Sequence, residues 1–183
     1  GEVLEPLALM ISRVFGEQTV TFRLATVERW ALAFEVGDAP RALEFAQLYE
    51  RQLKTVTPPA PLPEALVRLA IGQLHLLLGD APGALPPLRA AFDFQSSPEG
   101  PGGGYYRETQ ATLGRALVEA GQYSEGRALL GDSVTDLPPG APGRAHGAVA
   151  LARLAELAGR PEEAAALIES ERAALQQAPA HRR

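Results

Sequence analysis

The strongest constraint on the fold is a phrase that the sequence contains twice. VGDAPRAL at residues 36–43 returns as LGDAPGAL at residues 78–85, which is 42 residues later. The Gly of this phrase has two further counterparts, so that turn glycines stand at Gly37, Gly79, Gly121 and Gly159. Self-similarity at a period of about 20–50 residues is the signature of a repeat architecture. The sequence therefore predicts a chain built from repeated structural units.

Each of these glycines separates two stretches with helical periodicity. After the first Gly, Ala42, Leu43 and Ala46 recur at about the helical spacing, and before the third, Leu113 and Leu117 do so. Apolar residues at this spacing predict a helix with one buried face. Each unit is therefore predicted to be a helix, a tight turn and a second helix.

The residues of the turn have definite roles. A Gly just past the end of a helix can adopt the left-handed conformation that satisfies the last carbonyl groups. Asp38 and Asp80 are predicted to cap the next helix, because a carboxylate accepts hydrogen bonds from the first backbone N–H groups. Pro40, Pro82 and Pro161 fall in the first turn of the second helix, where a missing N–H is harmless. Such a short link predicts that the two helices pack antiparallel.

Loops rich in Pro and Gly separate the units, at residues 55–63, 96–104 and 136–143. These segments cannot continue a helix. We expect a single domain over residues 1–183, with repeats near residues 20–57, 62–95, 105–137 and 144–177 and an N-terminal capping helix over residues 1–16.

Small residues recur at fixed distances from the turn Gly. They lie seven positions before it in three units and five positions after it in all four, at Gly72, Gly114, Ala152, Ala42, Ala84, Gly126 and Ala164. This pattern resembles the tetratricopeptide repeat (TPR), a helix pair with a period of about 34 residues and signature small positions. The first unit departs from it, because Trp30 stands where the other units have the earlier small residue.

The TPR resemblance covers roughly residues 20–177 and has consequences for the fold. It implies an all-α protein in which about four antiparallel helix pairs stack into a right-handed superhelix. The longer period is also similar to the TPR-like regions of large bacterial transcriptional regulators. All basic residues except Lys54 are Arg, which is typical of a GC-rich bacterial genome.

Composition and motifs argue against several classes of function. The net charge of −5 argues against a nucleic-acid-binding surface, and no uninterrupted apolar run has the length of a membrane helix. The three histidines lie far apart in the sequence, and cysteine is absent, so we expect no metal site. The run GPGGG at residues 100–104 lacks the Lys-Ser/Thr of a phosphate-binding loop. We therefore expect no cofactor and no enzymatic activity.

Candidate binding residues follow from the TPR resemblance, which implies that the first helix of each pair lines a concave groove. The candidates lie three or six positions before the turn Gly or close by: Phe34, Gln73, Leu76, Arg115, Glu119, Arg153 and Glu156. Arg115 and Arg153 together could grip a carboxylate with paired hydrogen bonds. The alternative is that Arg115 pairs with Glu119 and Arg153 with Glu156 as local surface ion pairs.

The leading functional hypothesis is a non-catalytic scaffold that holds a protein or peptide partner in this groove. The alternative is the sensor or effector-binding region of a larger bacterial transcriptional regulator. Either hypothesis implies no direct contact with nucleic acid, and both leave a homodimer open. We expect a cytoplasmic protein, and an extracytoplasmic location stays open because the sequence begins with Gly instead of Met.

Overall fold

The computed structural model describes residues 20–98, 100, 103–131, 137–138 and 141–177. These residues form eight α-helices and no strand, so the all-α prediction is confirmed. None of the helices in these ranges is long and apolar enough to cross a membrane. The N-terminal helix predicted over residues 1–16 lies outside the described residues.

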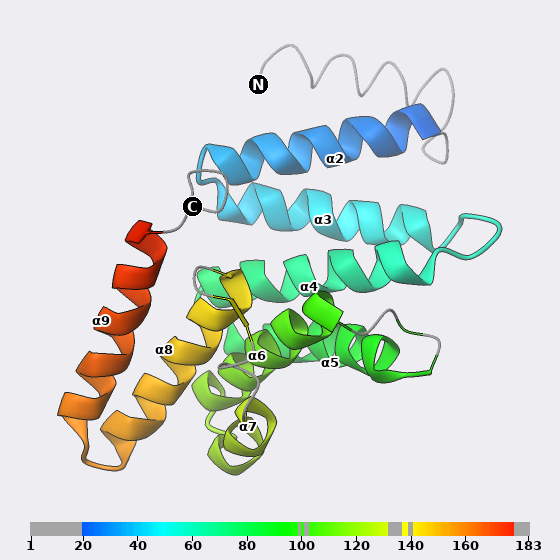
Figure 1. Cartoon of the computed structure of the whole chain (residues 1–183). Coiled ribbons are helices and arrows are strands. Elements are labelled where there is room, and N and C mark those ends of the chain that lie inside the picture. Colours follow the sequence, from blue (N-terminus) through cyan, green and yellow to red (C-terminus); the bar gives the residue numbers. More distant parts are fainter. Residues whose placement is uncertain (1–19, 99, 101–102, 132–136, 139–140, 178–183) are drawn as a thin grey trace. The chain divides into compact units, whose positions relative to one another are not determined.

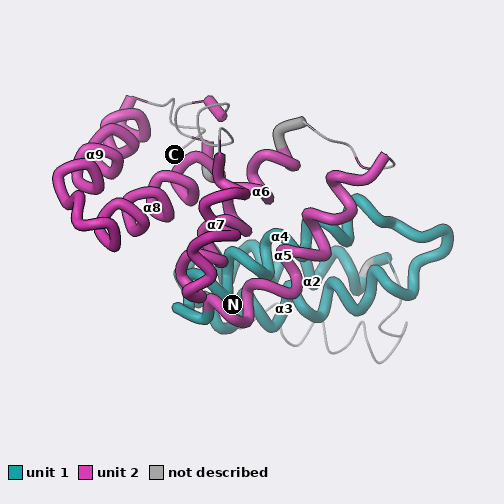
Figure 2. The backbone as a smooth tube through the Cα atoms, turned by 90° about the horizontal axis from the view of Figure 1, so that it is seen from below, with its two compact units in different colours: residues 1–80 teal, residues 81–183 magenta. Residues whose placement is uncertain are grey.

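The chain divides into two compact units, residues 1–80 and residues 81–183 (Figure 2). The boundary follows Asp80, in the turn of the second predicted repeat, so that the two helices of this repeat belong to different units. Each unit is described by itself below.

The first unit contains three helices that are described: α2 (Val20–Glu35), α3 (Ala39–Leu53) and α4 (Pro61–Leu77). The middle helix, α3, contacts both α2 and α4 (Figure 1). Two polar contacts fix this stack. The Gln52 Nε2 donates to Thr26 Oγ1 at 3.2 Å between α3 and α2, and Arg68 Nε donates to Glu50 Oε1 at 2.8 Å between α4 and α3.

The second unit contains α5 (Ala81–Ser96), α6 (Gly103–Glu119), α7 (Tyr123–Leu130), α8 (Pro142–Leu157) and α9 (Pro161–Gln177). Here α6 contacts α5, α7 and α8, and α8 also contacts α9. The pairs α6–α7 and α8–α9 are the third and fourth predicted repeats. Helix α7 is short and ends at Leu130, before Gly131 with its positive φ of 29°.

The repeated turn has the geometry that the sequence predicts. The glycines at Gly37, Gly79, Gly121 and Gly159 have φ between 72° and 82°. In the first turn, the Gly37 N–H donates to Phe34 O at 3.1 Å and the Asp38 N–H to Ala33 O at 2.9 Å. The same two bonds recur at the other three turns, which identifies each as a Schellman helix end. Asp38 Oδ1 accepts from the Arg41 N–H at 3.1 Å, so the predicted N-cap is confirmed there.

The recurrent small residues let paired helices approach closely. Ala42 and Ala84 are fully buried. In the second unit, a Cβ added to Gly126 of α7 would lie 2.7 Å from Val118 Cγ2 and 3.0 Å from the carbonyl oxygen of Gly114, both on α6. A methyl group at this crossing fits only if the Val118 side chain or the adjoining backbone shifts. The predicted role of the small positions is therefore confirmed for this pair.

Candidate functional site

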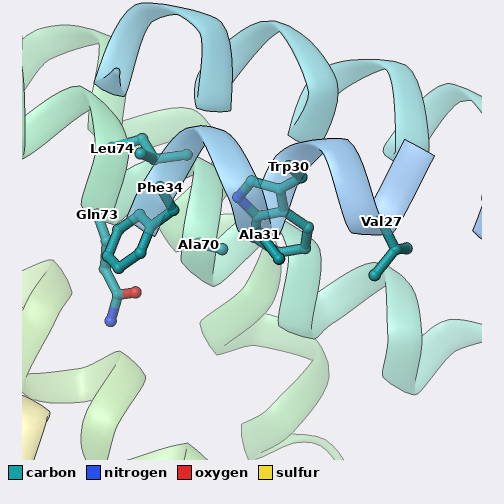
Figure 3. A pocket seen from close by; sticks show the side chains of 7 residues that line it. All are labelled: Val27, Trp30, Ala31, Phe34, Ala70, Gln73 and Leu74. Atoms are coloured by element: carbon teal, nitrogen blue, oxygen red, sulfur yellow. The ribbon is translucent and has the colours of Figure 1, made fainter. Parts of the chain in front are cut away.

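The most distinctive surface feature of the first unit is an apolar hollow between α2 and α4 (Figure 3). Its volume is about 300 Å³. Six of the seven lining side chains are apolar, and the seventh belongs to a glutamine. The lining residues are Val27, Trp30, Ala31, Phe34, Ala70, Gln73 and Leu74.

Helix α2 supplies the aromatic wall of the hollow. Trp30 is half-buried and packs against the apolar core of the unit, so its ring position is fixed from behind. Phe34 lies one turn later on α2 and is 60% exposed. Figure 3 shows the Phe34 ring beside the side chain of Gln73, which comes from α4. The wall of the hollow thus contains one half-buried aromatic side chain, Trp30, and one exposed aromatic side chain, Phe34.

The width of the hollow has a source in the sequence. Trp30 occupies the position at which the later repeats carry Gly72, Gly114 and Ala152. In the first unit, α3 contacts both of its neighbours. The described residues of α2 and α4, by contrast, have no Cα atoms within 8 Å of each other. The first helices of the third and fourth repeats, α6 and α8, do contact each other. A bulky indole in place of a small residue is consistent with the wider separation of α2 and α4.

The hollow brings together two of the residues that the sequence predicts for binding, Phe34 and Gln73. Leu76 comes from the same helix as Gln73, but only 4% of its surface is exposed. Leu76 is not among the residues that line the hollow.

Two further predicted residues, Arg115 and Glu119, form part of a polar cluster in the second unit. Arg115 Nε donates to Glu119 Oε1 at 2.6 Å, and Arg115 Nη1 lies 3.0 Å from Nδ1 of His146. A guanidinium has no acceptor, so Nδ1 must be unprotonated and the imidazole neutral. Burial and then the charge of Arg115 lower the pKa of His146 to about 4, in agreement with this assignment. Arg115 is therefore held by two neighbours within the protein.

The last two predicted residues pair with each other at the surface. Arg153 Nη1 donates to Glu156 Oε2 at 3.0 Å, and both side chains are more than half exposed. Arg115 and Arg153 thus each contact a carboxylate on their own helix, as the ion-pair alternative predicts. A joint grip of Arg115 and Arg153 on a ligand carboxylate stays a prediction.

Four residues of the hollow were not predicted from the sequence to lie at a site: Val27, Trp30, Ala70 and Leu74. The signal for Trp30 was present, since this residue breaks the small-residue pattern of the repeats. Ala70 and Leu74 gave no separate signal, because small and apolar residues on α4 are equally expected in the core.

Comparisons with known proteins concern the fold. No protein-family model matches the sequence, and no curated protein matches it. Two crystal structures from Podosopora anserina, described as nearly identical TPR-like repeats of a "putative kinesin light chain", are similar to this chain. One is a single-substitution variant, with a TM-score of 0.67 and 19% identity over 94% of this chain and 84% of that chain. The other has a TM-score of 0.65 and 20% identity over 97% of this chain and 87% of that one. The chain is therefore an all-α protein with a TPR-like helical-repeat fold.

Proposed function

We propose that the protein is a non-catalytic scaffold whose hollow between α2 and α4 binds a segment of a partner protein. The observation that carries this proposal is the aromatic pair of Trp30 and Phe34 at an open apolar surface. Binding energy at protein interfaces concentrates in a few well-packed residues, among which Trp is enriched. Because Trp30 is held from behind by the core, little of its conformational freedom remains to be lost on binding.

The size and chemistry of the hollow suit an inserted side chain of a partner. A cavity of about 300 Å³ has room for a large apolar side chain together with part of the adjoining backbone. Gln73 adds an amide, which can both donate to and accept from a peptide backbone. A contact of this kind combines apolar burial with a polar group that orients the segment.

The second candidate is an effector-binding region of a larger regulator, in which the hollow takes a small molecule. The same volume supports it, because sites for small molecules begin at about 300 Å³ and are mostly apolar with a few polar groups. A regulator of bacterial transcription would use such binding to shift an equilibrium between two conformations.

A site-specific cross-link tests the scaffold proposal. The photoreactive amino acid p-benzoyl-phenylalanine replaces Phe34 and, in a matched control, Leu157, an exposed apolar residue outside the hollow. Both proteins are irradiated in extract of the encoding organism, and the cross-linked proteins are identified by mass spectrometry. We expect a protein that cross-links from position 34 and not from position 157.

The affinity of the purified partner then decides between the candidates. Phe34→Ala should weaken its binding at least fivefold, since loss of an interface anchor costs more than about 1 kcal/mol, and Leu157→Ala should leave it unchanged. Unchanged affinity of Phe34→Ala would place the partner elsewhere. The effector-binding candidate would be supported by two results together: no cross-link forms from position 34, and the Trp30 emission responds to a small molecule.

A further inference from the structure

The solvent-facing side of α2 carries a stripe of apolar residues that continues from the hollow. Val20 and Leu24 are 62% and 61% exposed, close to the value for Phe34. Val20, Leu24 and three residues of the hollow recur with alternating steps of four and three residues, at Val20, Leu24, Val27, Ala31 and Phe34. This spacing gives a line of side chains along one face of the helix. We call these five residues the α2 stripe.

The described core of the first unit lies away from the α2 stripe. Among the residues of α2 whose burial is described, Phe22, Thr26 and Ala33 are buried, and they lie on the opposite face of the helix. Large contiguous apolar surfaces on folded proteins commonly mark binding sites. The α2 stripe is therefore a candidate contact surface.

The spacing of the stripe points to the shape of its occupant. Apolar residues at alternating steps of four and three form the seam against which a second helix packs side by side. From Val20 to Phe34 the stripe extends about 21 Å at the rise of an α-helix, which is longer than a ligand confined to the hollow requires. A helix lying along the stripe would place one of its apolar side chains over the hollow, between Phe34 and Ala70.

Exposed acidic residues border one side of the stripe. Glu28 and Glu35 are both exposed and stand seven residues apart, so they lie one above the other on the same flank of α2. The opposite flank carries Arg23 and Trp30. Charged residues beside such a seam select partner helices of opposite charge and fix their orientation. Basic residues on the matching flank of the occupant would complement Glu28 and Glu35.

We propose that the α2 stripe and the hollow together bind an amphipathic α-helix of a partner protein, with apolar residues at four-three spacing and basic residues along one flank. This inference rests on the proposed function and adds the secondary structure and charge of the bound segment. A second copy of this chain packed with its α2 antiparallel fits less well, because the acidic flanks of the two copies, with Glu28 and Glu35, would then lie beside each other.

The chain offers a direct reporter, because Trp30 is its only tryptophan and lies in the wall of the hollow. The probes are three-heptad synthetic peptides with blocked ends. The first has Leu at the seam, Lys on one flank and Ala elsewhere. The second replaces Lys by Glu, the third carries two central prolines that break the helix, and the fourth has the composition of the first in scrambled order.

We expect the first peptide to shift the Trp30 emission to the blue in a saturable manner and the scrambled peptide to leave it unchanged. Phe34→Ala should weaken binding of the first peptide about tenfold, and Leu157→Ala should not. The double variant Glu28→Lys, Glu35→Lys should weaken the basic peptide about tenfold at low salt and favour the acidic one, since two attractive pairs become repulsive. Circular dichroism of each variant checks that its helix content is unchanged.

Distinct results overturn the inference and the proposed function. If the proline peptide binds as tightly as the first, the site takes an extended segment, and the helix inference fails while the scaffold proposal stands. Equal affinity for the basic and acidic peptides in every variant overturns the role of Glu28 and Glu35. If the protein self-associates and its Trp30 emission shifts to the blue at the same time, the α2 stripe binds a second copy of the chain instead of a partner helix. If Phe34→Ala changes neither peptide binding nor binding of the cross-linked partner, the scaffold proposal fails as well.

Discussion

The close approach of α6 and α7 makes a quantitative prediction for Gly126→Ala. The added methyl group would lie 2.7 Å from Val118 Cγ2, 3.0 Å from the carbonyl oxygen of Gly114 and 3.2 Å from the backbone nitrogen of Val118. Two of these atoms belong to the backbone. The Val118 side chain is buried and stiff about its first torsion, so it cannot turn away freely. The methyl group can fit only if the two helices move apart.

Two opposing effects decide the size of the change. Replacing Gly by Ala inside a helix stabilises it by about 1 kcal/mol through helix propensity. Overpacking a tight core contact costs about 1–3 kcal/mol. We expect overpacking to prevail here, because backbone atoms form most of the contact, with a net loss of about 1 kcal/mol. The melting temperature should fall by about 2–4 °C.

Urea unfolding followed by far-UV circular dichroism measures this loss for Gly126→Ala. The control is Ser124→Ala in the same helix, at an exposed position, which should leave the stability unchanged or slightly raised. A Gly126→Ala protein that is as stable as the wild type, or more stable, would refute the reasoning. It would mean that α6 and α7 are farther apart than the structure has them.

Further predictions address the turn, the core, a titrating group and the hollow. Gly37→Ala should destabilise by about 1 kcal/mol, because an L side chain is strained at its φ of 76° although no atom lies within 4 Å of the added Cβ; an unchanged urea midpoint would contradict this. Ala84→Leu should lose about 1–3 kcal/mol by overpacking a fully buried position, and a neutral result would show that the repeat register is wrong. His146 has its pKa lowered to about 4 in the folded protein, from 6.5, so the unfolded chain binds the proton more readily. The free energy of unfolding should therefore fall by about 3 kcal/mol as the pH is lowered from 6.5 to 4. His146→Gln should lose less stability over this range, and parallel pH profiles of the two proteins would argue against the buried neutral imidazole. Phe34→Ala should change the melting temperature by less than about 2 °C, because the side chain is 60% exposed; a large drop in calorimetry would make Phe34 a core residue.

The repeat architecture could be predicted because it depends on local rules. A Gly that ends a helix, an Asp that caps the next one and a Pro in its first turn act through the backbone over a few residues. The turn at Gly37 and Asp38 recurs in the same form at Gly79, Gly121 and Gly159. At each of these turns one helix ends two residues before the Gly and the next begins two residues after it.

The candidate site could be predicted only in part, because it depends on which faces the helices leave open. Phe34 and Leu76 both lie three positions before a turn Gly, so the sequence pattern does not distinguish them. In the structure, Phe34 is largely exposed and Leu76 is buried. The departure of Trp30 from the small-residue pattern was visible in the sequence, whereas its consequence for the space between α2 and α4 is a matter of packing. The partnership of Arg115 with His146 joins residues 31 positions apart, and no local rule connects them.

The central claim is that the hollow between α2 and α4 is the surface that binds a partner protein. The fluorescence of Trp30 tests it most directly, because this residue is the only tryptophan of the chain and lines the hollow. Titration with the partner identified by cross-linking should shift the Trp30 emission to the blue and give the same dissociation constant as calorimetry. Phe34→Ala should raise the dissociation constant by the same factor in both measurements. Saturating binding that leaves the Trp30 emission unchanged, with full affinity in Phe34→Ala, would contradict the claim.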